Sequence, residues 1–216
     1  GQTEDLYYLA MEWVDGEALE KFAIRSGQLA PALVATIIEQ IGAALTAAHA
    51  QGIIHRDLKP ANIMYNPESQ RAVLLDFGIA RDSDLKPEER LTRTGFFVGT
   101  LQYVAPEALS GELVNQQADV YSLATIAYYL LTGSLPYNGR SPRELFQQLL
   151  TQAPTPLNQA VKGLKFPQAV EDAMTAGLER DLGKRCKTVD EFVGRLCTAL
   201  RQGGERKSFL KSIFGK

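Results

Sequence analysis

Cysteine, net charge and long apolar runs are all scarce in this sequence of 216 residues. The two cysteines, Cys186 and Cys197, are too few and too generically spaced for a disulfide framework or a cysteine metal site, so we expect reduced thiols. A net charge of −2 gives no general reason to bind nucleic acid. No uninterrupted apolar run is long enough to cross a bilayer, and no signal-peptide pattern opens the chain. These scarcities argue against a nucleic-acid-binding, disulfide-rich or membrane-spanning protein and favour a cytoplasmic one.

What the sequence does contain is enough apolar material for one substantial core, since 45% of its residues are hydrophobic. Apolar periodicity, capping boxes and Gly or Pro boundaries predict a mainly helical chain with a few short strands. The expected helices cover residues 18–26, 31–51, 119–131, 141–152 and 188–201, and Pro167 opens one more; the expected strands cover residues 6–13, 63–65 and 72–75.

The most informative stretch is His-Arg-Asp-Leu-Lys-Pro-Ala-Asn at residues 55–62, which is followed after a short strand pair by Asp-Phe-Gly at residues 76–78. Asn62 stands just before one strand and Asp76 just after the other, so both can face one metal site. Asparagine and aspartate oxygens suit hard cations such as magnesium. Asp57 can accept a hydroxyl proton, and Lys59 can neutralise a phosphate. The ordered pair of motifs is far more specific than either motif alone.

These two motifs resemble the catalytic loop and the metal-binding loop of eukaryotic-like protein kinases, most closely those of the bacterial serine/threonine kinases. The likeness runs from about Leu6 to about Leu200 and matches only the larger, C-terminal lobe. It implies an α+β fold: a mostly helical lobe with a small β-hairpin at the active site and no small lobe. The implied division is a last small-lobe strand and hinge at 1–15, the C-terminal lobe at 16–202 with an activation segment at 76–107, and a basic amphipathic tail or linker at 203–216.

The resemblance implies a role for each residue of the two motifs. Asp57 would orient and deprotonate a substrate hydroxyl, and Lys59 would neutralise charge on the transferred phosphoryl. Asn62 and Asp76 would hold Mg²⁺. ATP would be bound through its adenine by Met11, Glu12, Val14 and Met64, with Met11 as gatekeeper and Met64 as the floor under the ring.

Further implied residues belong to regulation and to the scaffold. Arg56 would pair with a phosphorylated activation segment. The other segment residues are Phe77 and Gly78 of the metal-binding loop, Thr92 and Thr94 as phosphorylation sites, Thr100, and Glu107. Glu107 would pair with Arg185, although Leu182 and Cys186 replace the prolines usual beside that arginine. Asp119 would accept hydrogen bonds from the catalytic-loop backbone.

The sequence holds no glycine-rich loop and no lysine of the VAIK type before the hinge. Because positioning supplies most of the catalysis of phosphoryl transfer, we expect this chain alone to be inactive and to bind ATP weakly. The apolar floor around Met11, Val14, Met64 and Phe77 would favour self-association or a partner that carries a small lobe. The expected partners of the complete enzyme are ATP and a protein substrate. The alternative function is a truncated, non-catalytic binding or regulatory module.

The tail at residues 206–216 combines four basic residues with apolar residues at helical spacing. It is compatible with a docked amphipathic helix, with a linker to a membrane anchor of a membrane-attached kinase, or with a frayed end.

Overall fold

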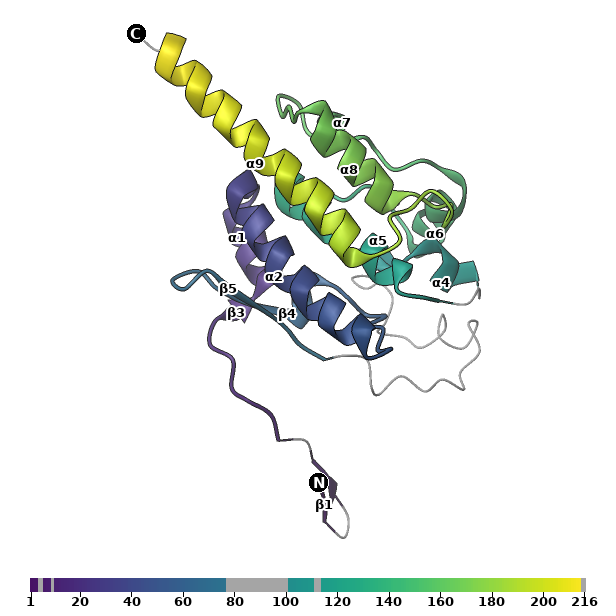
Figure 1. Ribbon diagram of the computed structural model, residues 1–216. Helices are drawn as coiled ribbons and strands as arrows, with labels where there is room; N and C mark the ends of the chain where they lie inside the picture. Colours follow the sequence, from purple (N-terminus) through teal and green to yellow (C-terminus); the bar gives the residue numbers. More distant parts are fainter. Residues whose placement is uncertain (4–5, 9, 77–100, 111–113, 215–216) are drawn as a thin grey trace.

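The computed structural model describes residues 1–3, 6–8, 10–76, 101–110 and 114–214. A helical body carries a small sheet along one side, and the N-terminal segment extends away from both (Figure 1). The helices are α1 (Leu19–Ser26), α2 (Pro31–Ala50), α4 (Pro106–Ser110), α5 (Gln117–Thr132), α6 (Pro142–Thr151), α7 (Leu157–Ala160), α8 (Gln168–Leu178) and α9 (Val189–Phe214), with 3-10 turns η1 (Pro60–Asn62) and η2 (Leu101–Tyr103). The strands are β1 (Gln2–Thr3), β2 (Leu6–Tyr7), β3 (Glu17–Ala18), β4 (Ile63–Asn66) and β5 (Arg71–Leu74). The expected α+β class is confirmed.

Helix α5 lies at the centre of the core and has almost no exposed residue, as its apolar sequence predicts. It packs against α2, α8 and α9. Its C-terminus is set by Gly133, which adopts a left-handed conformation (φ 68°) and donates its N–H to the carbonyl of Tyr129. The site is therefore built on a rigid, buried support.

Helix α2 corrects one expectation from the sequence. Over its 20 residues it has the length and apolar composition of a membrane span. Thr36, Glu39 and Gln40 interrupt its apolar residues, so no uninterrupted apolar run is visible in the sequence although the mean hydropathy of the helix is high. In the structure its apolar stripe faces α9, α5 and β5, and Ile37, Ile38, Ile41 and Leu45 are fully buried. Each such side chain contributes about 1.5–3 kcal/mol by burial, which is the behaviour of a core helix.

The two predicted capping boxes begin their helices. The hydroxyl of Ser141 accepts the N–H of Glu144 at the start of α6. The hydroxyl of Thr188 likewise accepts the N–H of Glu191 before α9, and the Glu191 carboxylate accepts the N–H of Lys187. Each box satisfies backbone donors that a helix start leaves open.

The small sheet has the order β3-β4-β5, with both pairs antiparallel. The expected hairpin of β4 and β5 is present, with Met64 opposite Val73, and β3 adds a third strand through Ala18 opposite Met64. Since β4 begins after Asn62 and β5 ends before Asp76, the hairpin brings both residues to the same end of the sheet.

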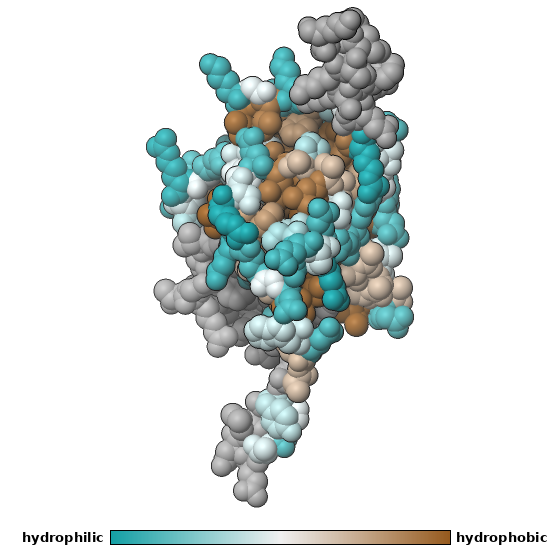
Figure 2. Space-filling model, turned by 90° about the vertical axis from the view of Figure 1, so that its left-hand side faces the viewer, coloured by the Kyte–Doolittle hydropathy of each residue, from teal (hydrophilic) through white to brown (hydrophobic). Residues whose placement is uncertain are grey.

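The expected strand over residues 6–13 is wrong in extent. Only Leu6–Tyr7 is a strand, paired with Gln2–Thr3, and residues 10–15 have no regular structure. A β-favouring sequence forms a strand only where a neighbour supplies ladder hydrogen bonds. Met11 and Trp13 are consequently 64% and 85% exposed, and the segment projects from the body (Figure 2).

Helix α9 is longer than predicted, because its backbone continues through the tail to Phe214 (Figure 1). Its middle passes close to the start of α8. A Cβ atom on Gly203 would lie 2.8 Å from the ring of Pro167, so glycine permits this approach. The backbone of residues 203–214 thus continues the helix.

Candidate active site

The catalytic-loop residues predicted to work together do lie together. The Asp57 carboxylate is 3.2 Å from the Lys59 ammonium through Oδ2. The amide nitrogen of Asn62 donates to the same Oδ2 at 3.2 Å and to the Asp57 carbonyl at 2.9 Å. The short loop between α2 and β4, closed by the η1 turn, therefore presents a carboxylate, a cation and an amide at one place.

Asp76 is tied to this loop through the residue before it. The N–H of Leu75 donates to the carbonyl of Asn62 at 2.9 Å, and the ring of His55 contacts the carbonyl of Leu75 at 3.0 Å. Asp76 itself is exposed and has a φ of 49°. Aspartate is among the few residues other than glycine that enter this left-handed region readily. The two motifs are thus joined by one backbone hydrogen bond and by the ring of His55.

The orientation of the Asn62 amide suits a magnesium ion. Because its nitrogen donates twice to Asp57, its Oδ1 is the remaining coordinating atom, and no hydrogen bond to Oδ1 is present among the described residues. An amide oxygen and the Asp76 carboxylate are ligands that Mg²⁺ accepts, with the remaining positions left to water or phosphate. The residues present therefore fit the expected ion.

His55 is fully buried and connects the two loops. Its Nδ1 accepts the N–H of Asp57 at 3.3 Å, so the ring proton is on Nε2, which donates to Leu75. The sequence motifs alone assign this histidine no separate role. Its ring contacts both the backbone N–H of Asp57 and the carbonyl of Leu75, the residue before Asp76.

Asp119 accepts hydrogen bonds from the backbone of the catalytic loop, as expected. It is fully buried in α5, and its carboxylate accepts the N–H of His55 at 2.9 Å and the N–H of Arg56 at 3.0 Å. Arg56 is exposed and has a left-handed φ of 62°, a conformation these bonds support. An unpaired carboxylate at this depth would be costly, so the three groups stabilise one another.

One further partner of Asp119 was missed from the sequence. The Nε2 of His49, near the end of α2, lies 2.7 Å from Oδ2 of Asp119, and the His49 side chain is only 6% exposed. The sequence does contain a clue to this contact. A carboxylate expected in the core needs several hydrogen-bond donors, and His49 is the nearest titratable side chain before the catalytic loop.

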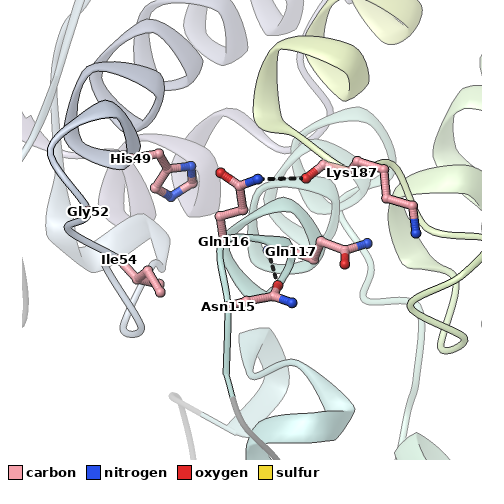
Figure 3. Close-up of a pocket in the computed structure, with 7 residues that line it drawn as sticks. All are labelled: His49, Gly52, Ile54, Asn115, Gln116, Gln117 and Lys187. Carbon is pink, nitrogen blue, oxygen red and sulfur yellow. Dashed lines mark hydrogen bonds between the residues drawn. The ribbon is translucent and has the colours of Figure 1, made fainter.

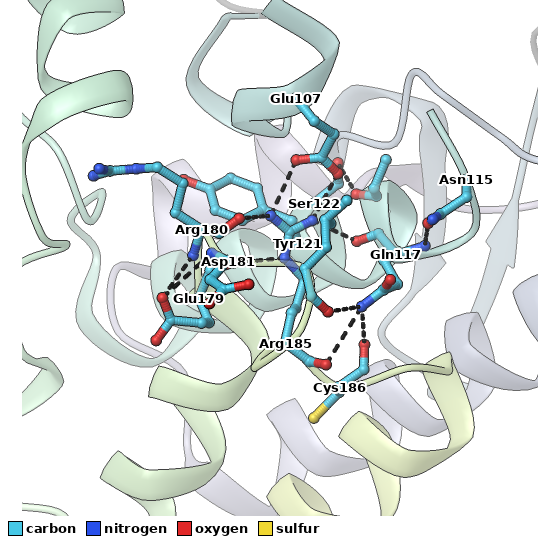
Figure 4. Close-up of polar contacts among 12 residues, drawn as sticks. Glu107, Asn115, Gln117, Tyr121, Ser122, Glu179, Arg180, Asp181, Arg185 and Cys186 are labelled. Atoms are coloured by element: carbon cyan, nitrogen blue, oxygen red, sulfur yellow. Dashed lines mark hydrogen bonds and ion pairs between the residues drawn. The ribbon is translucent and has the colours of Figure 1, made fainter. Parts of the chain in front are cut away.

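The expected ion pair between Glu107 and Arg185 is formed. The guanidinium makes two parallel bonds to the carboxylate, at 2.7 and 3.0 Å, and lies over the ring of Tyr121 (Figure 4). It also donates to the carbonyls of Glu179 and Gln117. Every face of this buried charge is therefore satisfied.

The two residues that replace the usual prolines do not disturb this turn. The N–H of Arg185 donates to the carbonyl of Asp181, and the Gln117 amide donates to the carbonyls of Leu182 and Cys186. These hydrogen bonds hold the backbone in place at the two positions where proline rings would otherwise restrict it.

The residues expected to bind adenine are not assembled to the same degree. Met11 and Glu12 are exposed in the irregular segment before β3, and Val14 is half-buried. Met64 is half-buried within β4. Phe77, Gly78, Thr92, Thr94 and Thr100 lie outside the described residues.

The chain is similar to known proteins over most of its length. The family model described as protein kinase domain matches residues 2–198. Serine/threonine-protein kinase pkn2 of Myxococcus xanthus is 34% identical over 201 residues, which are 92% of this chain and 24% of that protein. Serine/threonine-protein kinase PknD of Mycobacterium tuberculosis is 37% identical over 185 residues, which are 86% of this chain and 27% of that protein.

A similar solved structure is the crystal structure of Rad53 1-466 in complex with AMP-PNP, with a TM-score of 0.68 and 27% sequence identity. The match covers 87% of this chain and 45% of that one. The chain spans about a quarter of the length of the two curated relatives.

Proposed function

Because this chain belongs to the bacterial eukaryotic-like serine/threonine protein kinases, we propose that it is the catalytic lobe that transfers the γ-phosphoryl of ATP to a protein serine or threonine in the complete protein. The observation that carries this proposal is the joint placement of Asp57, Lys59 and Asn62, with the strand end before Asp76 bonded to Asn62. These groups are the ones that phosphoryl transfer requires on this lobe.

Each side chain has a part in the transfer. Asp57 orients the substrate hydroxyl and accepts its proton, while Lys59 and Asn62 hold the Asp57 carboxylate in place. Lys59 also offers its charge to the phosphoryl oxygens. Asn62 Oδ1 and the Asp76 carboxylate would hold magnesium, which would neutralise charge on the phosphates.

The direct test is a phosphotransfer assay of the complete protein with ATP and a generic serine/threonine substrate such as casein. Mass spectrometry of the product should find phosphoserine or phosphothreonine and no phosphotyrosine. Omission of magnesium should abolish transfer. A complete protein that folds and binds ATP without any phosphotransfer would instead support the non-catalytic binding or regulatory module.

Residues 1–216 alone should have negligible kinase activity and weak ATP affinity, because they contain neither a glycine-rich loop nor a VAIK-type lysine. The exposed side chains of Met11 and Trp13 should instead be covered by a small lobe, from the same polypeptide or from a partner. Sedimentation of this chain with and without a separately expressed kinase small lobe tests this point. Robust activity of residues 1–216 alone would contradict it, and self-association without small-lobe binding would identify a different occupant.

Regulation by phosphorylation at Thr92 and Thr94 is part of the proposal. Arg56 is exposed beside Asp57, and a guanidinium suits bidentate pairing with a phosphate. Mass spectrometry of the complete active protein should find one or both sites occupied; neither site occupied would count against it. A cytoplasmic location, in a soluble or a membrane-anchored kinase, is supported by the use of ATP and by the free thiols of Cys186 and Cys197.

A further inference from the structure

A recess opens between the end of α2, the segment 52–54 that leads into the catalytic loop, and the start of α5 (Figure 3). Its volume is about 380 Å³. His49 and Ile54 line one side, and Asn115 and Gln116 line the other. The recess lies outside the set of residues assigned above to the phosphoryl-transfer site.

Two amide side chains supply hydrogen-bonding groups on one side of the recess. Oδ1 of Asn115 accepts the N–H of Gln117 at 2.7 Å, which leaves its amide nitrogen as a donor. Nε2 of Gln116 donates to the carbonyl of Lys187 at 3.1 Å, which leaves its oxygen as an acceptor on the side of His49 (Figure 3). The Lys187 ammonium donates to the carbonyl of Leu182 and is turned away from the recess.

The free oxygen of Gln116 and the apolar side chain of Ile54 complement the N–H and the apolar flank of a peptide group better than an ion. The side chain of Ile54 points into the space between the two polar walls. No aspartate or glutamate among the described residues lines the recess, so the lining offers a cation no carboxylate. An anion gains little, because the first N–H groups of α5 are already bonded to Asn115 and Gln116.

The recess is also connected to the catalytic loop. The ring of His49 forms part of its wall, and Nε2 of that ring lies 2.7 Å from Asp119. The Asp119 carboxylate holds the backbone N–H groups of His55 and Arg56. A group that hydrogen-bonds or displaces the His49 ring therefore acts on the carboxylate that fixes the loop.

We propose that this recess is an effector site for an uncharged peptide segment of a partner protein, and that occupancy is transmitted to the catalytic loop through His49 and Asp119. Binding at the recess is independent of the kinase assignment. The effect on catalysis rests on the proposed function.

Binding is tested by NMR titration of the ¹⁵N-labelled complete protein with N-acetyl-alanine N′-methylamide. The matched probe is N-acetyl-alanine methyl ester, which differs by one N–H. The amide should shift the resonances of Ile54, Gln116 and Arg56, with at least threefold smaller shifts for the ester. No shift with either probe, or equal shifts with both, would overturn the proposal.

Transmission is tested with the variant His49→Gln, which keeps a donor for Asp119 but changes the wall of the recess. The amide probe should still shift Gln116, and the shift of Arg56 should fall by at least half. An unchanged shift at Arg56 would show that the probe reaches the loop directly and would contradict the relay. A circular dichroism melt confirms that the variant folds.

The catalytic consequence is tested by placing an amide in the recess covalently. The variant Asn115→Cys is alkylated with iodoacetamide or with iodoacetate, which add neutral and charged groups of nearly equal size. Burial raises the pKa of the native thiols Cys186 and Cys197, so they react slowly.

The amide adduct should change kcat at least twofold relative to the unalkylated variant, while the carboxylate adduct and a control adduct at exposed Lys165→Cys should not. If the two adducts at residue 115 change kcat equally, or if neither changes it, the proposed transmission to the catalytic loop is wrong. If the complete protein has no kinase activity at all, the proposed function fails, and the NMR titration still decides the binding site.

Discussion

Glu107 and Arg185, 78 residues apart in the chain, form a buried two-point ion pair that ties helix α4 to the loop after α8. Their side chains are 4% and 0% exposed. Because Glu107 is the last residue of the expected activation segment (76–107), this pair fixes the end of that segment to the core.

The variant Arg185→Met should lose about 3–5 kcal/mol of unfolding free energy, since it leaves the Glu107 carboxylate buried without its cation. Urea denaturation at pH 7 measures the loss. The double variant Arg185→Met, Glu107→Leu should recover part of it, because no lone charge then remains. If the loss of unfolding free energy in the double variant equals the sum of the losses in the two single variants, the pair is not coupled.

Replacing Asp119 by alanine should cost about 2–4 kcal/mol, because the buried N–H groups of His55 and Arg56 lose their acceptor. Hydrogen exchange at these two amides should accelerate beyond the change in global stability. The matched control is Asp172→Ala on α8, whose exposed carboxylate accepts a hydrogen bond from Gln168. Protection at His55 and Arg56 that equals wild type would contradict the anchoring role.

Stability should fall at alkaline pH because of buried tyrosines. Burial raises the pKa of Tyr128 from its ordinary value of 10.0 to about 12. The unfolded chain therefore ionises at lower pH than the folded protein, so stability is fully present below pH 10 and declines between about pH 10 and 12. Urea denaturation across this range should give a shallower decline for Tyr128→Phe. An identical slope would mean that Tyr128 does not titrate differently on folding.

Much of the scaffold was predictable because its signals are local. Pro31, the Ser141 and Thr188 caps and Gly133 each act within one helical turn, and they set the starts and ends that the structure shows. The catalytic motif was equally readable, since Asp57, Lys59 and Asn62 are brought together by one short turn.

The failures concern features decided by distant partners. The strand expected at residues 6–13 lacks a neighbour over most of its length, and local propensity cannot supply one. The contact between His49 and Asp119 joins two helices, so neither sequence window contains it. Helix α9 continues through a pair of glycines, Gly203 and Gly204, which a local reading takes as an end.

The account depends most on Asp57 as the group that accepts the substrate proton. The decisive measurement is the rate of phosphotransfer by the complete protein carrying Asp57→Asn, compared with wild type and with the exposed control Asp172→Asn. Asp57→Asn should lower kcat roughly 10²–10⁴-fold with little change in the KM for ATP, and Asp172→Asn should match wild type. A variant Asp57→Asn that transfers phosphate at the wild-type rate would contradict the assignment.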